Sequence, residues 1–132
     1  IGKSKNAALQ IGKTLGKNRV LAMLVDQNDN KSDLFVNFFG KSASMSKGLG
    51  GFHRLKHSPI VFVTSTYHGS QCVLEFELLD CPITGDKAVD MSTTSQRFSD
   101  ALEAAIRRHP EQYFWMHRRW RTRPADDPQP VY

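Results

Sequence analysis

The feature that most constrains the fold is an apolar run, Val20–Val25, that ends abruptly at the polar cluster Asp26-Gln27-Asn28. We interpret the run as a buried strand, and Leu34–Phe39 as a second strand that follows a polar loop. Ligands of open α/β sheets bind at the carboxyl ends of the strands, so the position of this cluster predicts a binding site. The alternative interpretation is a turn in which Asp and Asn side chains cap their own backbone.

The size and composition of the chain indicate one globular domain. A chain of 132 residues buries roughly two-thirds of its unfolded surface, and its 39% hydrophobic and 23% charged residues are ordinary for a globular protein. We assign residues 1–123 to the domain and expect a loosely ordered tail over Pro124–Tyr132. No apolar run reaches the roughly 18 residues of a membrane span, so we expect any membrane contact to occur at the surface.

Hydrophobic periodicity predicts an alternation of helices and strands. Pro59–Ser65 is almost continuously apolar, as in a parallel strand covered on both faces, whereas Gln71–Leu79 alternates like an antiparallel or edge strand. The remaining predictions are helices over Ile1–Lys17, Ser44–Lys56 and from Thr93 to near His109, a loop over Pro82–Asp90, and a new helical turn from Pro110. Together they predict an α/β fold, a layered αβα domain with a mixed, largely parallel sheet.

The charge is concentrated near the C-terminus. The segment Arg107–Arg123 holds six arginines and one acid, and it therefore carries the whole net charge of +5. Such a segment predicts an anionic partner. Its arginines alternate with aromatic residues, which is one pattern of nucleic-acid binding. On a helix, however, Phe114, His117 and Arg121 would share one face and Tyr113, Met116 and Trp120 another, which favours core packing.

The candidate chemistry of the side chains is limited. Five histidines are available for acid–base catalysis, but none has a serine or cysteine nucleophile at a recognisable spacing. His53 and His57 are four residues apart near a helix end. We expect them to be exposed there, where their partial positive charge is favourable, and not to form a metal site. Cys72 and Cys81 share no ligand spacing and are interpreted as reduced thiols. We therefore predict no metal and no cofactor.

Three segments in the same order resemble the bacterial lipid A biosynthesis acyltransferases, which belong to the wider lysophospholipid acyltransferase superfamily. The segments are Leu24–Asn28, Phe35–Gly40 and His109–Trp120. The resemblance implies an acyltransferase that moves a fatty acyl chain from an acyl-carrier-protein thioester to a hydroxyl of a lipid A precursor or related glycolipid. It implies action at the cytoplasmic face of the bacterial inner membrane, with no nucleic acid as a partner. The alternative function is a small basic nucleic-acid-binding module that uses the segment Arg107–Arg123.

The resemblance also implies a catalytic dyad, His-x4-Asp or His-x4-Glu, that this chain lacks. The residues five places after the five histidines are Ser58, Phe62, Val73, Phe114 and Thr122. We therefore interpret the chain as the C-terminal half of such an enzyme, an incomplete glycerolphosphate-acyltransferase-like domain that is inactive alone. The general-base histidine is expected before Ile1. An α/β domain cut in half exposes sheet edges, so we expect the fragment to self-associate.

The resemblance assigns substrate-binding roles to four pairs of neighbouring residues. Asp26 and Gln27 would orient the acceptor or pair with an arginine, and Phe38 and Phe39 would wall the acyl or glycolipid pocket. Gly40 and Lys41 would turn the chain toward the acceptor's phosphate. Arg118 and Arg119 would either hold an anionic head group or clamp the C-terminal helix onto the domain. Asn37 stands where the family usually has proline, which leaves the acceptor preference open.

Overall fold

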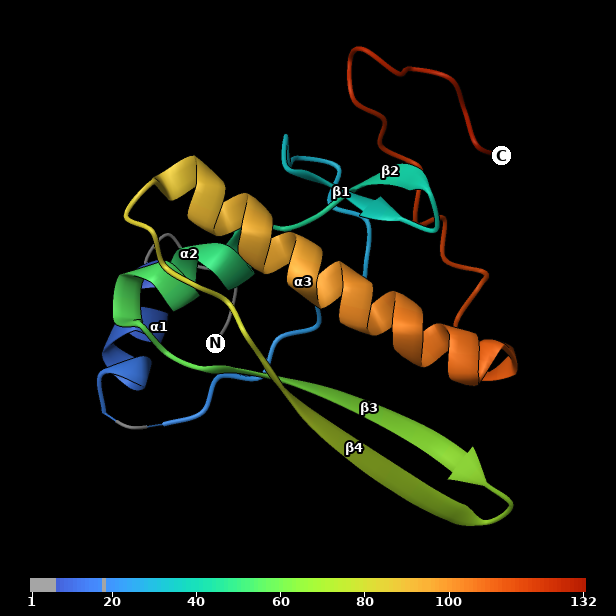
Figure 1. Ribbon diagram of the computed structural model, residues 1–132, viewed down its shortest axis with the longest axis horizontal. Coiled ribbons are helices and arrows are strands. Elements are labelled where there is room, and N and C mark those ends of the chain that lie inside the picture. Colours follow the sequence, from blue (N-terminus) through green and yellow to red (C-terminus); the bar gives the residue numbers. More distant parts are fainter. Residues whose placement is uncertain (1–6, 18) are drawn as a thin grey trace.

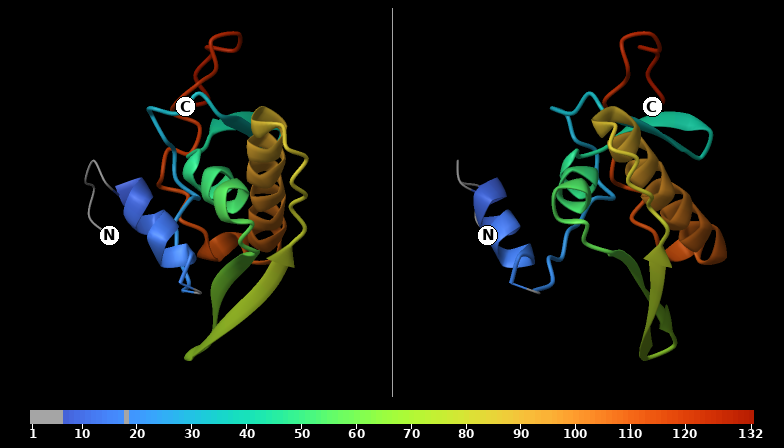
Figure 2. Two further views of the ribbon diagram at one scale, coloured as in Figure 1. Left: turned by 90° about the vertical axis from the view of Figure 1, so that its left-hand side faces the viewer. Right: turned by 60° about the vertical axis from the view of Figure 1, so that its left-hand side comes forward.

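The computed structural model describes residues 7–17 and 19–132 and shows helices and β-hairpins arranged around one long helix (Figure 1). In chain order the elements are α1 (Ala7–Leu15), β1 (Phe35–Phe38), β2 (Lys41–Ser44), α2 (Gly48–Lys56), β3 (Ile60–His68), β4 (Gln71–Leu79), α3 (Lys87–Arg108) and a 3-10 turn, η1 (Pro110–Gln112). Helix α2 and strand β1 both pack against α3, and α1 packs against α2. The β3–β4 hairpin projects away from the rest of the molecule, as all three views show (Figures 1 and 2).

The predicted strand Val20–Val25 is wrong, because this segment pairs with no strand of residues 7–17 and 19–132. Val20 and Leu24 are 92% and 88% exposed, whereas Val25 is buried against Val36 and Met45. Burial alternates along the segment, since Leu21 and Met23 are half-buried between exposed neighbours. The apolar run therefore contacts the core with one side only, and it forms no ladder of backbone hydrogen bonds with the described part of the chain.

The expectation of a layered, largely parallel sheet is not confirmed, although the fold does mix helices and strands. Strands of the described residues pair in two antiparallel hairpins, β1 with β2 and β3 with β4. Their connections are the dipeptides Phe39-Gly40 and Gly69-Ser70, in which Phe39, Gly40 and Gly69 have positive φ angles. Parallel neighbours need a crossover of about a dozen residues or more, so connections this short permit antiparallel pairing alone.

Two helix boundaries differ from the prediction for local reasons. Helix α3 begins at Lys87, within the predicted loop, because the Asp86 carboxylate caps it and accepts hydrogen bonds from the backbone N–H groups of Ala88 and Val89. Ser44 does not begin α2 as predicted, because it pairs with Phe35 in strand β2, and the helix begins at Gly48. The new turn at Pro110 is confirmed as η1, and the N-terminal helix is confirmed over Ala7–Leu15. The predicted part of that helix before Ala7 lies outside the described residues.

Helix α3 packs against every cluster of the hydrophobic core described below. Phe98, Leu102 and Ile106, which the sequence places on one face, contact three clusters of buried residues. The clusters are Val25, Val36 and Met45; Phe38, Ala43 and Ile106; and Phe62, Leu79 and Cys81. Each cluster joins α3 to a different part of the chain, so the hairpins and the C-terminal segment depend on this helix for their positions.

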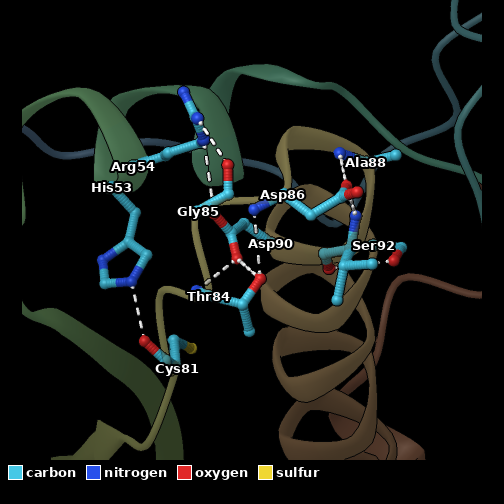
Figure 3. Close-up of polar contacts among 10 residues, drawn as sticks. His53, Arg54, Cys81, Thr84, Gly85, Asp86, Ala88, Asp90 and Ser92 are labelled. Atoms are coloured by element: carbon cyan, nitrogen blue, oxygen red, sulfur yellow. Dashed lines mark hydrogen bonds and ion pairs between the residues drawn. The ribbon is translucent and has the colours of Figure 1, made fainter.

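A buried carboxylate, Asp90, fixes the first turns of α3 to α2 (Figure 3). The N–H and hydroxyl of Thr84 both donate to Asp90 Oδ1 at 2.7 Å, and Arg54 Nε lies 3.2 Å from Asp90 Oδ2. The hydrogen bonds from Thr84, supported by the Gly85 amide and Arg54, hold the pKa of Asp90 below its usual value. The ionised form therefore stabilises the folded state.

Replacing Asp90 by asparagine is expected to lower the melting temperature at neutral pH by several degrees. Because the folded-state pKa is lowered, the stabilisation is complete above the unfolded pKa near 3.8 and is lost as the pH falls through the folded value. The difference between the variant and the wild type should therefore shrink below about pH 4. Thermal unfolding followed by circular dichroism from pH 3 to 7 measures it. Asp100→Asn, an exposed change on the same helix, is the control.

No helix within residues 7–17 and 19–132 combines the length and the apolar character that crossing a lipid bilayer requires.

Candidate functional site

The polar cluster predicted at Asp26-Gln27-Asn28 lies in a loop that the end of β2 holds in place. Val25 anchors the start of the loop in the core, and the backbone N–H of Asp29 donates to Ser44 Oγ at 3.1 Å. The Asp29 carboxylate in turn accepts from the N–H of Lys31 at 3.0 Å, which closes a local turn. The segment is therefore a turn in which an Asp side chain caps nearby backbone, as the alternative interpretation expected, and Ser44 fixes it to the domain.

Asn28 joins this loop to the C-terminal segment. Its side-chain Oδ1 accepts hydrogen bonds from Ser44 Oγ and from the N–H of Thr122, both at 3.0 Å, and its Nδ2 donates to Thr122 Oγ1 at 3.0 Å. Its backbone N–H donates to His117 Nε2 at 2.8 Å. Because Nε2 accepts, the hydrogen of the neutral imidazole is on Nδ1. The Asn28 side chain is thus bound to Thr122, which lies 94 positions away in the sequence.

A surface pocket of about 450 Å³ lies where these two segments meet. Its lining combines two guanidinium groups, an imidazole, two amides and two apolar side chains: Asn28, Asn30, Phe114, Met116, His117, Arg118 and Arg121. No acidic residue lines the pocket, and Phe114 and Met116 are largely exposed. Arginines bind phosphate and carboxylate oxygens through paired N–H groups, and the exposed apolar side chains suit a hydrocarbon. The chemistry therefore fits an anionic amphiphile.

The two predicted arginines have different environments. Arg118 is exposed and lines the pocket, as the head-group interpretation requires. Arg119 is buried, its Nη1 donates to the carbonyl of Ser44 at 2.5 Å, and its guanidinium lies 5.5 Å from the centre of the Phe38 ring. Burial lowers the pKa of Arg119, but a guanidinium remains protonated. Arg119 therefore clamps the C-terminal segment to β2, although not as part of a helix.

The residues of the β1–β2 hairpin do not line this pocket. Phe38 is fully buried against Ala43 and Ile106. Phe39, at the turn, is half-buried; its N–H donates to Glu103 Oε2 at 2.6 Å, and the Arg107 guanidinium lies 4.8 Å from its ring centre. Gly40 and Lys41 are exposed beyond it, and of the loop residues Asp26 is half-buried and Gln27 exposed beside Asn28. The structure thus brings Arg118 close to this loop, whereas it holds the Phe39-Gly40 turn against α3.

The sequence marked Asn28 as part of the predicted cluster and Arg121 as part of the arginine-rich segment, but it assigned no binding role to Asn30, Phe114 or His117 in this pocket. The signal for three of them was present, because Phe114, His117 and Arg121 were grouped together and all three line the pocket. Phe114, His117 and Arg121 come together through consecutive turns after η1 and not through a helix. Tyr113 and Trp120, which were placed on the other helical face, pack against Phe38. The sequence could not show that Asn28 meets this segment, because its hydrogen bonds to Thr122 join residues 94 positions apart.

The arginine-rich segment does not form a continuous basic surface. Four of its six arginines bind groups of the protein itself. Arg107 pairs with Glu103 at 2.6 Å and Arg108 with Glu75 at 3.0 Å, Arg119 is buried, and Arg123 donates to the Ser42 carbonyl at 2.7 Å and pairs with Asp127. Arg118 and Arg121 are the two that line the pocket. A groove that follows a nucleic-acid backbone needs a longer row of such side chains.

The histidines adopt positions that sequence spacing could not indicate. His53 is buried, contrary to the expected exposure, and its two ring nitrogens lie 2.7 and 2.8 Å from the carbonyl oxygens of Ser58 and Cys81. His57 is exposed at the end of α2, as expected. His109 Nδ1 lies 3.9 Å from Glu111 Oε1, beyond hydrogen-bonding distance. Residues 7–17 and 19–132 contain no group of three or more His, Cys, Asp or Glu side chains placed to hold a metal ion.

Comparison with known proteins identifies one family. Residues 3–122 match the sequence model of the family described as bacterial lipid A biosynthesis acyltransferase. The match includes the loop at Asn28, both hairpins, α3 and all residues that line the pocket. No curated protein matches the chain.

Proposed function

Because this chain belongs to the bacterial lipid A biosynthesis acyltransferase family, we propose that its pocket at Asn28, Arg118 and Arg121 binds the anionic head group of the acyl acceptor. The acceptor is a lipid A precursor or related glycolipid, and the acyl donor is an acyl-carrier-protein thioester. The observation that carries the proposal is the lining of the pocket, where two arginines and a histidine face no acid and lie beside exposed Phe114 and Met116.

The arrangement of the lining suits a lipid that lies at a membrane surface. Guanidinium groups bind phosphate oxygens in pairs, and the protein supplies two guanidinium groups within one pocket. The exposed apolar side chains contact the start of an acyl chain, where the head group meets hydrocarbon. The protein would therefore act at the cytoplasmic face of the bacterial inner membrane, where anionic lipids attract basic side chains.

The catalytic base of the transfer is not assigned to this chain. None of its five histidines has an acid five residues later, and no described histidine forms a hydrogen bond with a carboxylate. We therefore propose that residues of this chain bind and orient the acceptor, and that a histidine N-terminal to Ile1 removes the hydroxyl proton. Asp26 and Gln27 would contact the acceptor beyond the pocket.

Changing both Arg118 and Arg121 to glutamine is expected to weaken binding to anionic vesicles roughly 30-fold, because each basic residue contributes about 1 kcal/mol at an anionic membrane. The measurement is sedimentation with vesicles of phosphatidylcholine that contain phosphatidylglycerol, and with vesicles that carry a phosphorylated lipid A precursor. Both side chains are exposed, so the variant should unfold at the wild-type temperature.

Two further variants define the site. Arg97→Gln removes an exposed arginine of α3 that does not line the pocket, and it should leave binding close to the wild type. Asn28→Asp retains oxygen acceptors for Ser44 and Thr122 but adds a negative charge to the lining, so it should weaken binding. Equal losses for Arg97→Gln and for the double variant would show that net charge, and not this pocket, attracts the lipid.

A further inference from the structure

The imidazole of His117 has one nitrogen bound by the fold and one that is left for a ligand. Its Nε2 accepts the backbone N–H of Asn28 at 2.8 Å, so Nε2 carries the lone pair and Nδ1 carries the hydrogen. Within residues 7–17 and 19–132, the ring forms no other hydrogen bond. It is half-buried and lines the pocket. His117 therefore offers the pocket a neutral N–H donor, in the tautomer that the Asn28 amide selects.

Local turns fix the backbone that carries this ring. The N–H of His117 donates to the Phe114 carbonyl at 3.1 Å, and the N–H of Arg119 donates to the His117 carbonyl at 2.8 Å. Arg119 is itself buried and bound to the carbonyl of Ser44 in β2. The imidazole therefore loses little conformational freedom when a ligand binds, and this lowers the entropic cost of a contact with it.

The donors of the pocket fit three oxygens better than two. Arg118 and Arg121 line the pocket with paired N–H groups, and no acid lines it. A phosphodiester has two terminal oxygens, and two guanidinium groups already bind both of them. A phosphomonoester has a third terminal oxygen, which gives the Nδ1–H of His117 an acceptor. The combination of two guanidinium groups with a neutral N–H therefore suits a phosphomonoester.

We propose that His117 determines the specificity of this site by donating its Nδ1–H to a terminal oxygen of a phosphomonoester head group. The inference rests on the proposed function, because it assigns a chemical class to the anion of the same pocket. The two arginines attract any anion, whereas a neutral donor adds a contact without adding charge. The arginines thus supply most of the affinity, and the imidazole supplies the preference among anionic lipids.

His117→Gln and His117→Asn separate the roles of the two ring nitrogens. Glutamine places its amide near the position of Nε2, so it retains an acceptor for the Asn28 N–H but has no donor at the position of Nδ1. Asparagine places its amide near Nδ1 and retains a donor there, but it leaves the Asn28 N–H without this acceptor. We expect His117→Asn to bind a phosphomonoester more tightly than His117→Gln. A purely structural role predicts the opposite order.

The measurement is sedimentation at neutral pH with phosphatidylcholine vesicles that contain either phosphatidic acid, a phosphomonoester, or phosphatidylglycerol, a phosphodiester. The two kinds of vesicle are adjusted to the same zeta potential, so that they differ in the head group and not in surface charge. His117→Gln should weaken binding to phosphatidic acid about tenfold, the factor that one hydrogen bond to a charged group is worth, and binding to phosphatidylglycerol less than about twofold.

His57→Gln is the matched control, because His57 is exposed at the end of α2 and does not line the pocket. It should leave binding to both kinds of vesicle unchanged. Circular dichroism checks that each variant is folded. Nitrogen NMR of His117 in the unaltered chain tests the tautomer without any ligand, and it should find the hydrogen on Nδ1.

The possible failures are distinguishable. A hydrogen on Nε2, or a His117→Gln variant that keeps the wild-type preference for phosphatidic acid, would overturn the role of His117 alone. The same holds if His117→Gln binds phosphatidic acid more tightly than His117→Asn. If the double variant of Arg118 and Arg121 binds both kinds of vesicle as tightly as the wild type, the pocket is not the lipid site, and the proposed function fails together with this inference.

Discussion

Replacing Phe38 by alanine is expected to reduce the free energy of unfolding by about 3–5 kcal/mol, the largest effect that we predict for one residue. Phe38 is fully buried, and its ring centre lies 5.5 Å from that of Trp120 and 6.3 Å from that of Tyr113. The Trp120 indole also donates to the Phe38 carbonyl at 3.2 Å. The cavity would separate β1 from the C-terminal segment, and urea unfolding measures the loss.

Phe39→Ala is the matched control because it removes the same ring from the neighbouring, half-buried position. Alanine at this position meets the same positive φ angle of 52°, so the comparison isolates side-chain packing. We expect a loss of about 1–1.5 kcal/mol from contacts with Trp115 and Arg107. Phe38→Leu, which retains most of the volume, should cost less than Phe38→Ala. Equal losses for Phe38→Ala and Phe39→Ala would contradict the assignment of Phe38 to the core.

Replacing Gly50 by alanine is expected to destabilise the fold by about 2–3 kcal/mol, although alanine favours helices. Helix α2 passes so close to α3 at this point that a Cβ on Gly50 would lie 2.9 Å from Met91 Cα and 3.2 Å from Met91 O. Both atoms belong to the backbone, so one helix must move to relieve the contact. The movement would disturb the buried pairing of Arg54 with Asp90 across the same two helices.

Gly51→Ala, one residue further along α2, is expected to have the opposite effect. A Cβ at Gly51 meets no atom within 4 Å, so the change adds helix propensity and should stabilise the protein by about 0.5–1 kcal/mol. Urea unfolding of the two variants in parallel provides the test, because helix propensity alone predicts the same sign for both. If Gly50→Ala were as stable as Gly51→Ala, the close approach of α2 to α3 would be wrong.

The candidate site could be predicted only in part from the sequence. The sequence marked Asp26-Gln27-Asn28 and the arginine-rich segment separately, from composition and position alone. It could not show that Asn28 bonds to Thr122, because those residues are 94 positions apart and the contact uses a single amide. It also could not separate Arg118 from Arg119. Adjacent residues of an irregular segment have no fixed periodicity, and only the surrounding atoms decide that Arg119 is buried and Arg118 exposed.

The strands, too, were predicted only in part from the sequence. The prediction of an antiparallel or edge strand over Gln71–Leu79 is confirmed, whereas the parallel strand predicted over Pro59–Ser65 is wrong, because β3 pairs with β4 in an antiparallel hairpin. The apolar character of Val20–Val25 and Pro59–Ser65 predicted burial on both sides, but the described residues cover one side of each. An apolar composition indicates that a segment prefers burial, but it does not indicate which residues will cover it.

The sequence by itself determined the family, the apolar face of α3, the strand Gln71–Leu79 and the turn at Pro110, because each depends largely on local sequence patterns. The tertiary structure alone decided the pairing of the described strands in two separate hairpins, the burial of Phe38 and Arg119, and the pocket at Asn28. Those features arise from contacts between distant residues, whose free energies depend on which groups the whole fold brings within van der Waals and hydrogen-bonding distance.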